Sequence, residues 1–520
     1  MPPTTTAPPA TFRSQVGHIS RQSSVFLLGT LFTTLAGYFF KLYLARYLGA
    51  EALGIYALGM TVTGLAGVIA AAGLPQAASR FVAVYSATGE TEKLRGFLWS
   101  GLGVLLVSNL IVGAGILVMR FWVADRLYHT PSLASYLHFF VVIMIAGAIS
   151  GFLGQALAGY RDVARRTIIT NFVGQSVTMA CTIGLLTLGY GFAGYLIAQI
   201  ISAIAVVILL GRAIWQLTPP ASRPVPVAAG LTLQQEVVSF SMVLFAVQAL
   251  EYCLGQTDKI ILGIYLNARE VGIYSIAAAL VGFVPLALQS VNQIFSPTIA
   301  ELSARGESAL LARLFRSLVK WTLGLTLPLA VVVILFAPSI LGMFGPDFVA
   351  GWPALVAGTL GQLVNCGVGS VGYLLLMSGH QRKLLRVQSV MAVALVVANL
   401  LLIPRIGLLG AAAAGAIITV LSNLWYLREV HASLGIRPSL RKYRDLLMPA
   451  LLMVVVVMLI RRFVTIAAPA WAIILLALAA GYSVFIVASL LFLDDDDREV
   501  ADAIWSRIAG MTGAGRDANS

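Results

Sequence analysis

The chain has 520 residues, of which 59% are hydrophobic and 11% are charged, and its formal net charge is +13. Soluble proteins carry roughly 25% charged residues, so this composition excludes an ordinary soluble enzyme or binding domain and indicates a polytopic membrane protein. The positive charge does not indicate a nucleic-acid partner, because the basic residues are scattered in short loops between apolar runs, where membrane orientation accounts for them.

Apolar runs near the ~20 residues that cross a bilayer follow one another from Ser24 to Leu493, with short polar breaks between them. Continuous runs of this kind differ from the alternating pattern of a membrane β-barrel. We therefore predict an all-α membrane protein with about 14 transmembrane helices. They are placed at residues 24–45, 54–73, 97–119, 136–157, 167–188, 192–212, 237–257, 270–295, 318–341, 352–377, 385–403, 407–427, 446–464 and 470–493.

The loops divide these helices into two halves of six and a final pair. The connector Thr218–Pro226 is the long Pro-rich loop of the chain, and it falls between the sixth and seventh predicted helices. The predicted organisation is a partly disordered cytoplasmic tail (1–23), an N-lobe (24–217), a cytoplasmic linker (218–232), a C-lobe (233–430), a helix pair (431–493) and a cytoplasmic tail (494–520). Six helices in each half make the halves parallel, as in transporters that hold a central cavity between two lobes.

Alternate loops differ in their basic charge. Roughly 25 of the 34 lysine and arginine residues fall on the side of the membrane that carries the N-terminus. Because cytoplasmic loops are enriched in these residues, both termini are predicted to be cytoplasmic.

The two halves repeat one stretch of sequence. With Lys41 aligned on Lys259, an offset of roughly 218 residues, six further positions match. Tyr47, Leu48, Ala50, Gly54, Ile55 and Tyr56 align with Tyr265, Leu266, Ala268, Gly272, Ile273 and Tyr274. Two later sets of residues match in the same order, Ser86 to Glu90 with Ser303 to Glu307, and Gly191 and Gly194 with Gly407 and Gly410. Internal duplication is the interpretation that these anchors favour.

The sequence offers no sign of a catalytic or metal centre. Cys181, Cys253 and Cys366 lie far apart in apolar runs and are interpreted as packing residues, and Asp494–Asp497 as the solvated end of the last helix. No Gly-x-x-x-x-Gly-Lys-Ser/Thr phosphate loop occurs, so the chain is not expected to hydrolyse ATP or to act as an enzyme, and no cofactor is expected.

Polar residues recur at helical spacing in the first and seventh predicted helices. The stripes are Thr30, Thr33 or Thr34, Gly37 and Lys41 in the first, and Ser241, Gln248, Glu251, Gly255 and Asp258 in the seventh. Ionisable residues within a membrane helix tend to face an interior cavity. Glu251 is therefore a candidate site for a coupling Na+ or H+, with Asp258 beside it, and a partner for Lys41 is the alternative role of Glu251.

The repeat places Lys41 and Lys259 at equivalent positions. They are expected to face each other across the pseudo-two-fold axis, where they suit a diphosphate, although lysines near helix ends also extend to the headgroups without a ligand. Gln289 and Asn292 of the eighth helix are expected either to bind sugar hydroxyls in the same cavity or to hold helices together. Pro285 of that helix aligns with Gly67, so both helices are expected to bend at matching depth.

Several motifs carry a family resemblance. They are Ala45–Tyr56, Ala72–Phe81, Thr257–Gly263 and Val271–Tyr274. The chain resembles the Wzx-like oligosaccharide flippases and polysaccharide export proteins of the MATE-like multidrug/oligosaccharidyl-lipid/polysaccharide (MOP) superfamily over about residues 20–430. The resemblance implies two six-helix lobes around a cavity, and cationic residues that hold the pyrophosphate, which map onto Lys41, with Arg46 and Lys259 as further candidates.

The resemblance implies a flippase that moves a polyprenyl-diphosphate-linked oligosaccharide across the bacterial cytoplasmic (inner) membrane by alternating access. Coupling to Na+, H+ or the membrane potential would supply the energy, and polysaccharide synthesis proteins would be partners. A peptidoglycan lipid-precursor flippase and a MATE-type ion-coupled drug exporter are the alternatives. The drug exporter is kept open by Glu251 and Asp258, because it would need a more acidic cavity.

Overall fold

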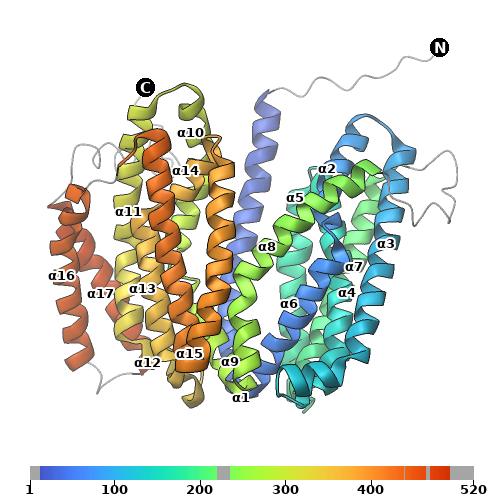
Figure 1. The fold of residues 1–520 in the computed structure, drawn as a ribbon, viewed down its shortest axis with the longest axis horizontal. Coiled ribbons are helices and arrows are strands. Elements are labelled where there is room, and N and C mark those ends of the chain that lie inside the picture. Colours follow the sequence, from blue (N-terminus) through green and yellow to red (C-terminus); the bar gives the residue numbers. More distant parts are fainter. Residues whose placement is uncertain (1–11, 220–234, 438–439, 464–468, 492–520) are drawn as a thin grey trace, which may run out of the picture. The chain divides into compact units, whose positions relative to one another are not determined.

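The computed structural model describes residues 12–219, 235–437, 440–463 and 469–491, and all regular structure within these ranges is helical (Figure 1). The all-α fold class is therefore confirmed. The aspartates 494–497, and the greater part of the predicted linker and of both predicted tails, lie outside the described residues.

The chain divides into two compact units between Gly272 and Ile273. The first unit holds the helices up to the start of α9. These are α1 (Phe12–Ala71), α2 (Leu74–Ala87), α3 (Thr91–Val118), the π-helical turn η1 (Trp122–Leu127), α4 (Ser132–Gly159), α5 (Val163–Thr167), the π-helical turn η2 (Ile168–Gly174), α6 (Gln175–Thr187), α7 (Gly191–Leu217), α8 (Gln235–Tyr265) and α9 (Ala268–Val281).

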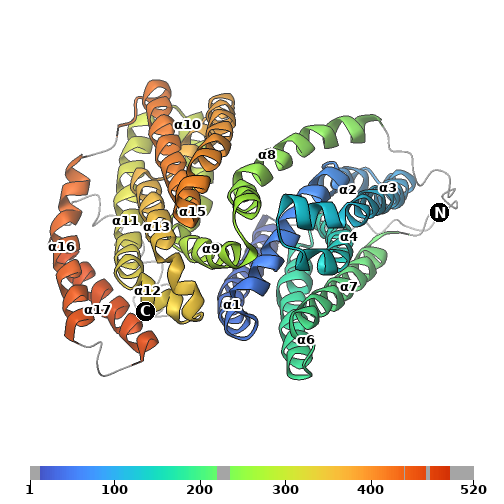
Figure 2. The ribbon, with the colours of Figure 1, turned by 60° about the horizontal axis from the view of Figure 1, so that its bottom comes forward.

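The second unit holds the remaining helices. These are α10 (Leu286–Ala304), α11 (Ser308–Leu335), α12 (Ala337–Gly342), the 3-10 helix η4 (Pro346–Gly351), α13 (Trp352–Val368), α14 (Val371–Met377), α15 (Gln381–Leu434), α16 (Leu440–Phe463) and α17 (Ala470–Leu490). Within this unit α16 and α17 pack on each other and along α11, as Figure 2 shows.

Ten helices in the described ranges are long and apolar enough to cross a membrane, or twelve if each of two bent pairs forms one span. The predicted number of fourteen differs because two observed helices each cover two predicted spans. Helix α1 has non-helical backbone at Gly49, and α15 has it at Ile406 and Gly407. Gly49 falls in the predicted gap at 46–53, and Ile406 and Gly407 fall where the predicted gap at 404–406 meets the next predicted span. Gly49 and Gly407 adopt positive φ angles of 80° and 58°, which glycine tolerates without steric cost.

The predicted bend at Pro285 is present, but its predicted counterpart at Gly67 is wrong. Helices α9 and α10 meet at an angle of 50° just before Leu286. Proline lacks the N–H that a continuous helix would use there. In contrast, α1 is helical through Gly67 and ends at Ala71, where Ala72 and Gly73 adopt positive φ angles. A single glycine removes no backbone hydrogen bond, so it permits a bend without imposing one.

A second break, between α13 and α14, lies within the predicted span 352–377. The two helices differ in direction by 48°. Gly369 adopts φ 81° and ψ −155° between them, a conformation that requires glycine. The equivalent predicted span of the first half, 136–157, lies within the unbroken helix α4. The two halves therefore differ at this helix.

The repeated motif packs against its own copy within the first unit. A Cβ atom at Gly54 of α1 would overlap the carbonyl oxygen of Ala268 in α9, and a Cβ atom at Gly272 would overlap the carbonyl oxygen of Ala50. Exchanging each residue for its repeat partner turns one contact into the other. Reciprocal contacts of this kind arise around a two-fold axis. The residues that the sequence repeat aligns therefore make equivalent contacts in the structure.

Candidate functional site

The repeat-related lysines, Lys41 and Lys259, lie on neighbouring helices of the first unit. Lys41 is exposed on α1 and Lys259 is half-buried on α8, and the two helices lie side by side (Figure 1). Neither side chain forms an ion pair with an acidic residue in the described part of the chain. The structure thus places the two repeat-related lysines on neighbouring helices, and that they face each other stays a prediction.

Close backbone packing positions the end of α8 that carries Lys259. Gly263 faces Leu58 of α1 and the ring of Tyr128, whose Cδ1 would lie 2.6 Å from a Cβ atom at this glycine. Burial raises the pKa of Tyr128 to about 12, so this neighbour is neutral. A glycine at this point lets α8 approach α1 directly.

The polar neighbours of Lys259 are only partly those predicted. The Nζ atom of Lys259 donates to Oε1 of Gln256 at 2.9 Å, and the carboxylate of Asp258 accepts from the backbone N–H of Lys259 at 2.8 Å. Arg46 is exposed on α1, five residues after Lys41. Asp258 and Arg46 both have further interactions. The sequence analysis missed Gln256, whose spacing of three residues from Lys259 could have indicated it.

Glu251 is exposed on α8, and it makes no hydrogen bond or ion pair with a described residue. Its neighbour Tyr252 points toward α1, where its hydroxyl donates to the carbonyl oxygen of Thr61 at 2.7 Å and packs against Gly64. Adjacent helical residues point about 100° apart. The structure therefore places Glu251 on a different face of α8 from the one that packs on α1, and the alternative role as a partner of Lys41 is not observed.

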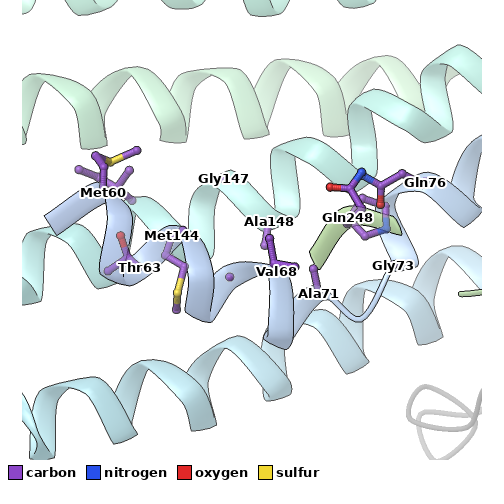
Figure 3. A pocket seen from close by; sticks show the side chains of 14 residues that line it. Met60, Thr63, Val68, Ala71, Gly73, Gln76, Met144, Gly147, Ala148 and Gln248 are labelled. Atoms are coloured by element: carbon purple, nitrogen blue, oxygen red, sulfur yellow. The ribbon is translucent and has the colours of Figure 1, made fainter. Parts of the chain in front are cut away.

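Gln248 lines a cavity of about 300 Å³ within the first unit. Its walls come from α1, the start of α2, α4 and α8. The lining residues are Met60, Thr63, Gly64, Gly67, Val68, Ala71, Gly73, Pro75, Gln76, Ile143, Met144, Gly147, Ala148 and Gln248. Figure 3 shows the carboxamides of Gln76 and Gln248 beside each other at one end, and Met60 at the other.

The cavity wall carries no ionisable side chain. Thr63 is engaged within its own helix, because its hydroxyl donates to the carbonyl oxygen of Gly59 at 2.7 Å. The carboxamides of Gln76 and Gln248 make no hydrogen bond with any described residue. Gln76 lies in the motif Ala72–Phe81, yet the sequence analysis did not select it, since its partner Gln248 is far away in sequence.

Gln289 and Asn292 lie on α10 in the second unit. Gln289 is exposed, whereas Asn292 is buried and its side-chain oxygen has no hydrogen-bond partner in the described residues. Burial of Asn292 fits the predicted alternative of contact between helices at least as well as a sugar contact.

Comparison with known proteins gives a family and a fold. The family model described as polysaccharide biosynthesis protein matches residues 19–303, which is more than half of the chain. An uncharacterised membrane protein of Methanocaldococcus jannaschii is 21% identical over 381 residues, covering 70% of this chain and 75% of that protein.

Two solved structures share the fold at low identity. The lipid II flippase MurJ in an inward closed conformation has a TM-score of 0.74 and 16% identity, covering 90% of this chain and 98% of MurJ. An inward-facing multidrug resistance MATE family transporter of the MOP superfamily has a TM-score of 0.60 and 15% identity, covering 78% and 95%. The resemblance to the MOP superfamily is thus confirmed at the level of fold, and the chain belongs to the polysaccharide biosynthesis protein family.

Proposed function

We propose that the chain is a flippase for a polyprenyl-diphosphate-linked oligosaccharide, which it moves across the bacterial cytoplasmic membrane by alternating access. The observation that carries the proposal is the placement of Lys41 and Lys259 on the neighbouring helices α1 and α8, where neither forms an ion pair with an acidic residue in the described part of the chain. Membership of the polysaccharide biosynthesis family supports an oligosaccharide cargo.

The electrostatics of the lysine pair favour an anion. Two like charges on neighbouring helices repel each other, and this repulsion is unfavourable in the empty protein. A diphosphate between them would convert the repulsion into two charge-assisted hydrogen bonds, which are roughly twice as strong as neutral ones. A diphosphate also has enough oxygens to contact both ammonium groups at once.

The remaining parts of the proposal follow from the membrane orientation. Both termini are assigned to the cytoplasm by the basic loops. The chain moves its cargo without chemical change, so it needs no cofactor and is not an enzyme. Proteins of polysaccharide synthesis supply the cargo on one side and consume it on the other.

Methionine at Lys41 or Lys259 is expected to slow translocation at least about 30-fold, because truncating one partner of a desolvated charge contact costs roughly 2 kcal/mol or more. The assay is movement of a polyprenyl-diphosphate saccharide between the leaflets of proteoliposomes. The same variants should be at least as heat-stable as the wild type without ligand, since each removes a repulsion. A purely structural lysine would give the opposite change in stability.

Lys93→Met is the matched control. Lys93 is an exposed lysine of α3, a helix that carries neither Lys41 nor Lys259, and its Nζ atom lies 2.6 Å from the carboxylate of Glu90 at the start of the same helix. Full activity in the double variant Lys41→Met/Lys259→Met would contradict the proposed diphosphate site. Transport of cationic drugs but of no lipid-linked saccharide would instead support the exporter alternative.

We propose Glu251 as the site of a coupling Na+ or H+. Transport driven by an imposed ion or proton gradient should lose its dependence on that gradient in Glu251→Gln, while slow transport without a gradient persists. The neutral carboxamide keeps the size of the side chain but not its negative charge. Glu236→Gln, a change near the start of the same helix, serves as the control. Undiminished gradient dependence in Glu251→Gln would exclude this role.

A further inference from the structure

We propose that the cavity between Gln76 and Met60 binds a secondary amide group carried by the headgroup of the cargo, such as the acetamido group of an amino sugar. This inference rests on the proposed function and deepens it. Its starting point is a pair of carboxamides, those of Gln76 on α2 and Gln248 on α8, which have no hydrogen-bond partner among the described residues.

The chemistry of the wall selects a neutral group. No residue that lines the cavity is ionisable, so a phosphate or an ammonium group would enter without a counter-charge. The hydroxyl groups of a hexose in this cavity would face Met60, Val68 and Met144, whose side chains offer them no hydrogen-bond partner.

An amide fits the two ends of the cavity. Each glutamine carboxamide offers an N–H donor and a carbonyl acceptor, and a secondary amide presents the complementary acceptor and donor. The acyl methyl group would then lie against the apolar wall, where methionine side chains adapt to its shape. A purely hydrocarbon ligand would use the wall but leave both carboxamides unpaired.

The position along α8 agrees with a cargo that is also held at the lysine pair. Gln248 precedes Lys259 by eleven residues, which is three helical turns, so both lie on the same face of α8. The rise along the helix between them is about 16 Å. A headgroup of two or three sugars, at roughly 5 Å each, spans this length from a diphosphate. Ser241, seven residues before Gln248 on that face, is buried, and its hydroxyl has no partner in the described residues.

Among the glycines that line the cavity, Gly147 faces open space. Gly64, Gly67, Gly73 and Gly147 all line the cavity, and a Cβ atom at Gly147 of α4 would meet no other atom within 4 Å. A side chain at Gly147 would therefore occupy the cavity without disturbing the packing of the helices. Gly151, one turn further along α4, is equally open but does not line the cavity.

The test compares translocation of three synthetic lipids in proteoliposomes. All carry farnesyl diphosphate, linked to a trisaccharide of N-acetylglucosamine, to a trisaccharide of glucose, or to the glucose trisaccharide with an added alanyl peptide. The wild type should prefer the amide-bearing lipids. Gln76→Met and Gln248→Met keep the side-chain volume but not the hydrogen bonds, and each should reduce the ratio of the rate for an amide-bearing lipid to the rate for the glucose lipid roughly tenfold.

The controls separate a binding role from a structural one. Gln235→Met, at the exposed start of α8, should retain the preference. Gly147→Leu should abolish it and Gly151→Leu should not. A preference confined to the N-acetylglucosamine lipid identifies an amino sugar as the source of the amide, and one confined to the peptide lipid identifies a peptide.

Two failures have different meanings. Equal rates for all three lipids in the wild type and in both glutamine variants would overturn the amide site and leave the flippase proposal standing. A wild type that translocates none of the three lipids would overturn the flippase proposal itself.

Discussion

Gly54→Ala is expected to reduce the free energy of unfolding. The loss should exceed the roughly 1–3 kcal/mol that overpacking of a core usually costs. The added methyl carbon would overlap the carbonyl oxygen of Ala268. A side chain could rotate away from such an overlap, but a backbone carbonyl cannot, so α1 and the start of α9 would have to separate. Gly272→Ala should cause a loss of the same size, because its methyl group would meet the carbonyl oxygen of Ala50 in the equivalent contact.

Thermal unfolding of the purified protein in detergent measures this effect. Gly255→Ala is the matched control, because a Cβ atom on this α8 glycine would meet no atom within 4 Å. The control should be neutral or slightly stabilising, since alanine favours helix more than glycine does. Melting temperatures for Gly54→Ala and Gly272→Ala equal to that of Gly255→Ala would show that the reciprocal contact is absent in solution.

Asp445→Ala is expected to destabilise the second unit by up to about 3–5 kcal/mol, because it removes an acidic partner of the largely buried Lys320 charge. The Nζ atom of Lys320 on α11 lies 3.8 Å from the carboxylate of Asp445 on α16, and their side chains are only 9% and 12% exposed. Two further hydrogen bonds join the final helix pair to α13 and α11. The hydroxyl of Tyr443 on α16 donates to the carbonyl oxygen of Gly367 at 2.7 Å, and that of Tyr482 on α17 donates to the carbonyl oxygen of Leu325 at 2.7 Å.

The double variant Lys320→Met/Asp445→Leu separates the charge from the packing. It should recover most of the lost stability, since apolar residues of similar volume replace a buried ion pair at little cost. Limited proteolysis between α15 and α16 reports on the docking of the helix pair, and the melting temperature reports on the unit. If Asp445→Ala is as stable as the double variant, the ion pair does not hold α16 in place.

The contact of Tyr443 also links α16 to the break between α13 and α14. Gly367 lies two residues before Gly369, where the helix is interrupted, and carbonyl oxygens at a helix end lack intrahelical partners. The first half of the chain has no counterpart of the final helix pair, and its equivalent helix α4 is continuous. The extra pair is therefore attached at the helix where the two halves differ.

The sequence by itself determined the class of the fold and the register of the repeated motif. Apolar runs of membrane-spanning length leave a chain little choice but helices. A duplicated sequence places equivalent residues at equivalent positions, which is why the alignment of Gly54 with Gly272 and of Ala50 with Ala268 agrees with the reciprocal contacts of these residues.

Only the tertiary structure decided which helices continue, which face each polar side chain occupies and which distant residues share a cavity. Gly67 stays helical, whereas Gly369 ends a helix, because a glycine permits a bend but the packing around it decides whether one forms. Glu251 and Tyr252 are adjacent in sequence, yet only Tyr252 packs on α1, since the rotation of α8 is fixed by close contacts at Gly64, Gly73 and Gly263. Gln76 and Gln248 meet for the same reason, and no local pattern in the sequence records where two helices cross.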